Sequence, residues 1–431
     1  MKKVLALLIV SLIAFSLGCI GGGEKTATPS STESTKSAEV QVIRIGLLTD
    51  LSGPAASKGQ IVKNTVELAE EDINTYFKEK GLPYKVEILV EDTRADPKVA
   101  LEKLQILKAQ DVNVAVGLYS NEVRNVQKYA TSNKIIVISP SSTAPPKLIG
   151  FTKPEDKKFI FRFVPTDLFQ SKVIAAEIEE LGLKGIAIVY RGDAWGRGLH
   201  DALVEEIEGK VEIGADVEYP SSPTPADWSP YIAKLEDGVK DLISKYGKDK
   251  VGVWAVGFDE VATLLTQIPD DSVLLQVKWI GTDAMVGNQK IIEEAKDKAV
   301  KVGLFSTQFY SESDETAKLK EKFKAKFGGE PDQYGLNAYD ATWVVALAYV
   351  EVLKEKGSYD PDLMVQKIKE VLEKYNSGAY GVKPVTGTIE LDEWNDRSSG
   401  DYAIYKVTES GWEMIGIWKS DTGKIEWSEK P

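Results

Sequence analysis

Side chains that suit the two ends of a small polar molecule follow directly after several predicted strands. The first half of the chain supplies mostly hydroxyls, in the segments 117–122 (GLYSNE) and 139–145 (SPSSTAP). Later segments supply an aromatic pair and a carboxylate, namely Trp195, Phe258 and Asp283. Hydroxyls and backbone amides at helix N-termini suit an anionic group, and a carboxylate opposite them suits an amine. An α-amino acid carries both groups on one carbon.

Most hydrolytic and metal-dependent chemistry is excluded by composition. The 431 residues include one His, His200, and one Cys, Cys19, which excludes zinc sites built from His and Cys and an intrachain disulfide. Neither a Gly-x-Ser-x-Gly elbow nor a Gly-x-x-x-x-Gly-Lys-[Ser/Thr] phosphate loop occurs. A net charge of −13 argues against nucleic-acid binding. We therefore expect no enzyme, no catalytic residue, no metal and no cofactor, and we interpret His200 as a surface residue without a role.

Alternating strands and helices must position the polar segments. Short apolar runs predict strands at 42–48, 84–90, 113–116 and 135–138, with helical stripes between them. The same rhythm restarts after Thr166, with strands at 185–190, 211–217, 251–256 and 277–280. This β-α alternation predicts parallel sheets with right-handed crossovers, and its two runs predict two similar α/β lobes. In such sheets ligands bind beyond the carboxyl ends of the strands, which is where the polar segments lie.

The last third of the chain has a different pattern. It is helix-rich at 315–327, 335–356 and 361–374, and it ends in three predicted strands at 386–391, 402–407 and 412–418. These elements do not form a third βα unit by themselves. They must complete the lobes begun earlier, so both lobes are expected to be discontinuous.

The N-terminus carries an export signal. Lys2 and Lys3 precede an apolar run over 4–17, which is short for a membrane span, and Cys19 stands at the expected cleavage point. This pattern resembles a lipoprotein signal, in which the Cys is lipidated; the alternative is an uncleaved signal anchor. Residues 20–39 are mostly Gly, Ser, Thr and Pro with charged residues between them, and they predict a disordered linker. Both alternatives tether the protein outside the cell.

The chain resembles a known family over residues 43 to 430. It is similar to the branched-chain amino acid binding proteins of ABC importers, which have the type I periplasmic-binding-protein fold. The matching stretches are LLTDLSGPAASKGQ (47–60), EDTRADPKVAL (91–101), VAVGLYSNEV (114–123), IIVISPSSTAP (135–145), RGDAWGRGL (191–199), WIGTDAMVGN (279–288) and YGLNAYDATWVVALA (334–348). An ordered set of this length is far more specific than any single short motif.

The resemblance implies a ligand site. By it, Ser120 and Thr143 hold the carboxylate and amine of the ligand, the Ser142 carbonyl accepts from the amine, and Asp283 provides the counter-charge. Aromatic neighbours of the ligand side chain would be Tyr119, Trp195 and Phe258. Lys58 stands where the family often has an aromatic residue, so the identity of the amino acid stays open.

Each of these residues also has a purely structural interpretation. Ser120 is a common type of helix cap, and residues 141–143 are typical of a plain turn. Trp195 is typical of a packing residue, and Asp283 is typical of a cap for a helix near Asn288. These alternatives are decided by where the side chains lie.

The strand pattern predicts two α/β lobes, and the resemblance implies that they are doubly wound parallel-sheet lobes joined by a three-strand hinge, with the lobe limits that follow. The expected segments are a signal peptide at 1–18, a lipidated Cys and linker at 19–42, one lobe from 43–163 with 308–401, and another from 164–307 with 402–431. The resemblance implies a monomeric, membrane-tethered solute-binding protein that captures an amino acid and delivers it to an ABC permease. Alternatives are a binding protein for an amide, urea or other small solute, or a ligand-sensing receptor domain of the same fold.

Overall fold

The first lobe is built on a five-stranded parallel sheet. The computed structural model describes residues 40–431, and the strand order in this sheet is β2-β1-β3-β4-β5. The strands are β1 (Gln41–Thr49), β2 (Tyr84–Asp92), β3 (Val114–Gly117), β4 (Ile136–Ser139) and β5 (Ile160–Arg162). The helices between them are α1 (Ala56–Glu79), α2 (Pro97–Ala109) and α3 (Ser120–Ser132), and a 3-10 turn covers Pro154–Lys157. β3 and β4 are buried at every residue, as expected for parallel strands covered on both faces.

The second lobe is built on an eight-stranded sheet in the order β13-β12-β11-β10-β9-β8-β6-β7. Its strands are β6 (Gly185–Arg191), β7 (Glu212–Tyr219), β8 (Val251–Val256), β9 (Lys278–Ile280), β10 (Phe305–Tyr310), β11 (Asp401–Thr408), β12 (Gly411–Lys419) and β13 (Lys424–Trp427). Its helices are α4 (Asp167–Glu180), α5 (Ala194–Ile207), α6 (Ser229–Tyr246), α7 (Glu260–Gln267), α8 (Gln289–Glu294) and α9 (Lys296–Lys301), with 3-10 turns at Lys248–Lys250, Val273–Gln276 and Asp283–Met285. The pairs from β7 to β10 are parallel, and those from β10 to β13 are antiparallel. The predicted parallel core of this lobe is confirmed, with antiparallel strands added at one edge.

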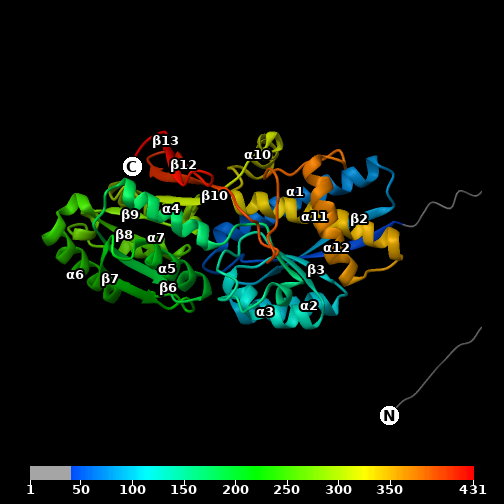
Figure 1. Cartoon of the computed structure of the whole chain (residues 1–431), viewed down its shortest axis with the longest axis horizontal. Helices are drawn as coiled ribbons and strands as arrows, with labels where there is room; N and C mark the ends of the chain where they lie inside the picture. Colours follow the sequence, from blue (N-terminus) through cyan, green and yellow to red (C-terminus); the bar gives the residue numbers. More distant parts are fainter. Residues whose placement is uncertain (1–39) are drawn as a thin grey trace, which may run out of the picture. The chain divides into compact units, whose positions relative to one another are not determined.

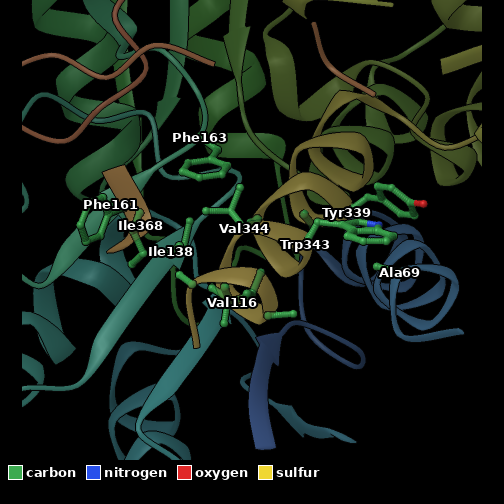
Figure 2. Packing of buried hydrophobic residues seen from close by; sticks show 14 of the residues in the cluster. Ala69, Val116, Ile138, Phe161, Phe163, Tyr339, Trp343, Val344 and Ile368 are labelled. Carbon is green, nitrogen blue, oxygen red and sulfur yellow. The ribbon is translucent and has the colours of Figure 1, made fainter. Parts of the chain in front are cut away.

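The helices of the last third return to the first lobe. They are α10 (Asp314–Phe327), α11 (Gln333–Lys356) and α12 (Pro361–Ser377). α11 lies beside the blue α1 in Figure 1, and α12 packs on α11. α11 is buried around nearly its whole circumference because it lies between other helices and the sheet. Figure 2 shows part of this core, where Val116 and Ile138 of the sheet lie near Val344 of α11 and Ile368 of α12.

The chain passes between the two sheets after β5, after β10 and before β11. These crossings agree with the expected two-lobed fold. The limits of 43–163 with 308–401 and of 164–307 with 402–431 stay a prediction. The signal segment 1–18, Cys19 and most of the linker 19–42 lie outside the described residues. Over residues 40–431, none of the helices combines the length and apolar composition that crossing a membrane requires.

One predicted strand is wrong. Residues 386–391 form no strand, and only Leu391 makes an isolated bridge, with Arg397. The buried carboxylate of Asp340 instead accepts from the backbone amides of Val385 and Thr386, each at 2.9 Å, and from the Thr386 hydroxyl at 2.6 Å. The Ile389 amide donates to the Asn376 side chain of α12 at 3.0 Å. Side chains of α11 and α12 thus accept from the Thr386 and Ile389 amides, which a neighbouring strand would have used.

Candidate functional site

Two loops at the carboxyl edge of the first sheet are joined through Ser120. Its hydroxyl oxygen accepts from the backbone amides of Thr143 and Ala144, each at 3.1 Å, and from the Ser142 hydroxyl at 3.3 Å. Ser120 is the first residue of α3, and its hydroxyl bonds to the neighbouring loop rather than to its own helix. The predicted hydroxyl cluster is therefore formed, and the simple helix-cap interpretation of Ser120 does not describe it.

The backbone conformation at the end of β3 allows the two loops to approach each other. Gly117 ends β3 with a φ of 121°, and a Cβ there would lie 1.9 Å from the Leu48 carbonyl oxygen. Only glycine fits at this position, and the turn that follows delivers Tyr119 and Ser120 to the edge of the sheet. The Ser142 carbonyl, expected to face the ligand amine, already accepts from the Arg162 guanidinium at 3.1 Å. Its proposed role stays a prediction.

The three aromatic residues meet as expected, and they come from both lobes. Trp195 and Phe258 stack with ring centroids 4.8 Å apart and an interplanar angle of 14°. The Tyr119 ring lies 5.3 Å from Phe258, and its buried hydroxyl has no hydrogen-bond partner. The Arg191 guanidinium lies 4.6 Å from the Phe258 centroid and pairs with Asp193 at 2.7 Å. All three aromatic rings also pack in the same apolar cluster, so the packing interpretation of Trp195 holds alongside any ligand contact.

Asp283 follows β9 and is buried. One of its carboxylate oxygens accepts from the Ala284 amide at 2.9 Å, and the other accepts from the hydroxyl of Tyr334 on α11. Burial raises the pKa of Asp283, while the Tyr334 hydroxyl and the Lys58 ammonium offset part of the rise. The cap of the following helix, α8, is Asn288. Asp283 therefore does not cap that helix, and its carboxylate faces a residue of the other lobe.

Asp167 is a residue that the sequence analysis missed. It is the first residue of α4, its side chain is fully buried, and neither carboxylate oxygen has a hydrogen-bond partner. Its amide donates to the Thr143 carbonyl at 2.7 Å. Burial and the neighbouring Asp283 carboxylate raise the pKa of Asp167 well above its ordinary value. In the sequence, Asp167 could have been identified as a site residue by its position after β5. A three-residue strand, however, is too short to show strand periodicity.

Residues after β1 contact the second lobe directly. The Ser57 hydroxyl donates to Asp259 at 2.6 Å, and the Asp259 amide donates to the Pro54 carbonyl at 2.9 Å. Lys58, the departure from the family pattern, is buried; its ammonium pairs with Asp332 at 2.6 Å and donates to the Val286 carbonyl. The loops at the carboxyl ends of β1, β8 and β9 are thus held together.

One pocket lies away from these residues. It has a volume of about 800 Å³ and is lined by α10, α11 and the end of α12, including Tyr339, Trp343 and Tyr375. None of the predicted ligand residues lines it. His200 is also away from the site; the surface interpretation is wrong, because its ring is largely buried and stacks on Tyr190 at 4.1 Å.

The gathered groups are suited to binding. Hydroxyls, carboxylates and aromatic rings from both lobes provide hydrogen bonds, charge and apolar contact. Within residues 40–431, no group of three or more His, Cys, Asp or Glu side chains is placed to hold a metal ion.

Comparisons with known proteins agree with this fold. The family model described as "Periplasmic binding protein" matches residues 42–411. An uncharacterized protein of Methanocaldococcus jannaschii is 51% identical over 96% of this chain and 97% of its own length. The leucine-, isoleucine-, valine-, threonine-, and alanine-binding protein of Pseudomonas aeruginosa is 26% identical over 84% of this chain and 89% of its own.

A solved structure has the same fold. The branched-chain amino acid transporter substrate binding protein LivJ from Streptococcus pneumoniae, in complex with isoleucine, superposes with a TM-score of 0.69 and 18% identity. The match covers 86% of this chain and 98% of that one. The two-lobed arrangement is therefore an established one.

Proposed function

Because the chain belongs to the periplasmic binding protein family, we propose that it captures an amino acid between its two lobes outside the cell and delivers it to an ABC importer. The names of relatives support the ligand class, since one is a leucine-, isoleucine-, valine-, threonine-, and alanine-binding protein. A solved neighbour of the same fold holds isoleucine and belongs to a branched-chain amino acid transporter.

One observation supports the proposal: buried polar groups of both lobes lie where the lobes contact each other. Asp283 of the second lobe accepts from the Tyr334 hydroxyl of the first, and the Asp167 amide donates to the Thr143 carbonyl at 2.7 Å. The first lobe contributes the hydroxyls of Ser120, Ser142 and Thr143. We assign the hydroxyl loops to the ligand carboxylate and Asp283 to the amine. Tyr119, Trp195 and Phe258 are assigned to the walls of the side-chain pocket.

Capture in this arrangement requires lobe closure. Contacts from both lobes give the ligand a higher affinity for the closed form, and that difference shifts the equilibrium between open and closed forms. The contacts of Ser57 with Asp259 and of Lys58 with Val286 are among those that opening would break. We propose that the closed form delivers the ligand to the ABC importer.

The tether is proposed from the sequence alone. Cys19 follows an apolar segment and precedes a Gly-, Ser- and Thr-rich stretch, and we assign it as the lipid attachment point. This places the protein at the outer face of the cell membrane, next to a permease.

Ligand identification tests the function. Mass spectrometry of small molecules that copurify with the protein, followed by thermal unfolding with each amino acid, should reveal stabilisation. A ligand at 100 times its Kd adds about 2.7 kcal/mol. Stabilisation by urea, an amide or another solute with none from any amino acid would contradict the amino acid assignment and leave the solute-binding role.

A further inference from the structure

One cavity lies within the first lobe, among α1, α10, α11, the end of α12 and residues 378–385. Its volume is about 800 Å³, which is typical of a small-molecule site. None of the residues assigned to the amino acid lines it, so the proposed function does not account for it. Figure 2 shows two of its lining side chains, Tyr339 and Trp343, next to each other on α11.

The inner wall of the cavity is aromatic. Tyr339, Trp343 and Tyr375 line it, and each is at least nine-tenths buried. The rings of Trp343 and Tyr375 are nearly parallel, with an interplanar angle of 18° and centroids 6.4 Å apart. Leu319 and Val385 are also buried and add aliphatic surface. Walls of this kind favour a flat, apolar ligand body.

One hydrogen-bond donor of this wall is unused. The Tyr339 hydroxyl donates to Asp72 at 2.7 Å, and the Tyr375 hydroxyl donates to Asp340 at 2.9 Å. The buried indole Nε1 of Trp343 has no hydrogen-bond partner. It lies near the Tyr339 hydroxyl without the geometry of a hydrogen bond. Because an indole N–H can only donate, an occupant that satisfies it must bring an acceptor.

The charged side chains at the rim of the cavity balance one another. They are three carboxylates and three ammonium groups, on Asp72, Asp314, Glu315, Lys318, Lys322 and Lys383. Lys322 pairs with Asp72 at 2.8 Å, and Lys318 pairs with Glu315 at 2.8 Å. The other two side chains, of Asp314 and Lys383, are exposed and opposite in sign. The rim therefore has no surplus charge to neutralise an ionic ligand, which favours an uncharged one.

Hydrogen bonds fix the segment that completes the cavity. The Ser313 hydroxyl, at the start of α10, donates to the Pro384 carbonyl at 2.8 Å. The Val385 amide donates to Asp340 of α11 at 2.9 Å, and this carboxylate also holds Tyr375 of α12. The three helices are thus joined through residues 384–385. A cavity with fixed walls needs little ordering on binding, which favours affinity.

We propose that this cavity is a second ligand site, which takes an uncharged aromatic compound carrying a carbonyl or ring acceptor. The aromatic ring packs against Trp343 and Tyr375, and the acceptor receives the hydrogen bond of the Trp343 N–H. The site lies away from the residues assigned to the amino acid. The inference therefore goes beyond the proposed function and does not depend on it.

Nuclear magnetic resonance of the ¹⁵N-labelled full chain tests the site with benzamide as the probe. The indole N–H signal of Trp343 is identified by its absence from the spectrum of Trp343→Phe. Benzamide should shift this signal to saturation, because its carbonyl accepts from the N–H. Benzoate and benzylamine have similar rings but carry opposite charges, and both should bind more weakly than benzamide.

Three variants locate the binding. Trp343→Phe keeps a ring but loses the N–H, and it should weaken benzamide binding measured by calorimetry at least about fivefold. Val382→Phe places a larger side chain in the cavity and leaves the Trp343 N–H intact, so it should abolish binding. The matched control is Trp228→Phe in the second lobe, which also removes a buried indole N–H without a partner and should match the wild type. Thermal unfolding of each variant confirms that it folds.

The outcomes are separate from those of the proposed function. A Trp343 signal that benzamide leaves unchanged at millimolar concentration would overturn the site, as would binding that neither Trp343→Phe nor Val382→Phe weakens. Tighter binding of benzoate or benzylamine would overturn the assignment of an uncharged ligand. Amino acid binding should be the same in the wild type, Trp343→Phe and Val382→Phe, and its loss in both cavity variants would contradict a site independent of the interlobe residues.

Discussion

Glu122 should make this protein less stable as the pH rises from about 4.5 to 8. The residue lies in the first turn of α3 and is fully buried, and its carboxylate accepts from the Tyr119 amide at 2.7 Å. Burial raises the pKa of Glu122 from 4.5 to about 8, while the Thr93 hydroxyl and the Tyr119 amide offset part of the rise and Asp50 and Asp96 add to it. The group that positions Tyr119 is thus held in its protonated form.

The direction of the pH dependence follows from the number of protons that the folded and unfolded states bind. Between pH 4.5 and 8 the folded chain keeps a proton on Glu122 that the unfolded chain has released. Stability contributed by this residue is therefore complete below about pH 4.5 and is lost as the pH rises through the folded pKa of about 8. At 1.36 kcal/mol per pKa unit, the loss is on the order of 5 kcal/mol at most.

Glu122→Gln is the decisive change, because its amide oxygen can still accept from Tyr119 and cannot ionise. Urea unfolding of the wild type and the variant at several pH values gives the free energy of unfolding for each. The variant should gain stability relative to the wild type steadily from pH 5 to 8, approaching a few kcal/mol. Parallel pH profiles for the two proteins would refute the reasoning, since the ionisation of Glu122 would then contribute nothing to the pH dependence of stability.

Four other changes have expected outcomes. Asp283→Asn should weaken amino acid binding by at least about thirtyfold by calorimetry, because a buried amine would lose its counter-charge; a change below threefold would contradict this role. Glu177→Met should raise the free energy of unfolding at neutral pH by about 1–3 kcal/mol, since an unpartnered buried carboxyl is replaced by an apolar side chain, and a less stable variant would show that Glu177 has a partner. Lys58→Met should favour the open form by removing the contact with the Val286 carbonyl of the second lobe, which small-angle scattering would report as a larger radius of gyration without ligand. Cys19→Ala should abolish lipidation and alter membrane fractionation, and an unchanged mass of the mature N-terminus would argue against a lipid anchor.

The link between Asp283 and Tyr334 ties ligand binding to lobe contact. Tyr334 belongs to α11 of the first lobe and donates to a carboxylate of the second. A ligand amine at Asp283 would share that carboxylate with the tyrosine. Any movement of the lobes must therefore change the hydrogen bonding of the group assigned to the amine.

Local patterns determined much of the fold. Parallel strands such as β3 and β4 are short apolar runs, and their periodicity is visible without knowing their neighbours. Helix starts are equally local: Asp96 and Pro97 predict the beginning of α2, where the Asp96 side chain accepts from the Lys98 amide at 2.8 Å. The hydroxyl loops around Ser120 could also be predicted, because the carboxyl ends of parallel strands meet at one edge of a sheet.

Partners distant in the sequence were decided only by the tertiary structure. Lys58 donates to the Val286 carbonyl, and Tyr334 donates to Asp283, contacts that depend on how the lobes meet. Residues 386–391 alternate like a strand, yet the Thr386 amide donates to Asp340 of α11 and the Ile389 amide donates to Asn376 of α12. Asp167 follows a strand too short to recognise, and its unsatisfied carboxylate becomes visible only when its surroundings are known. Sequence periodicity reports which face of an element is buried, whereas the charge balance of a site depends on which side chains folding brings together.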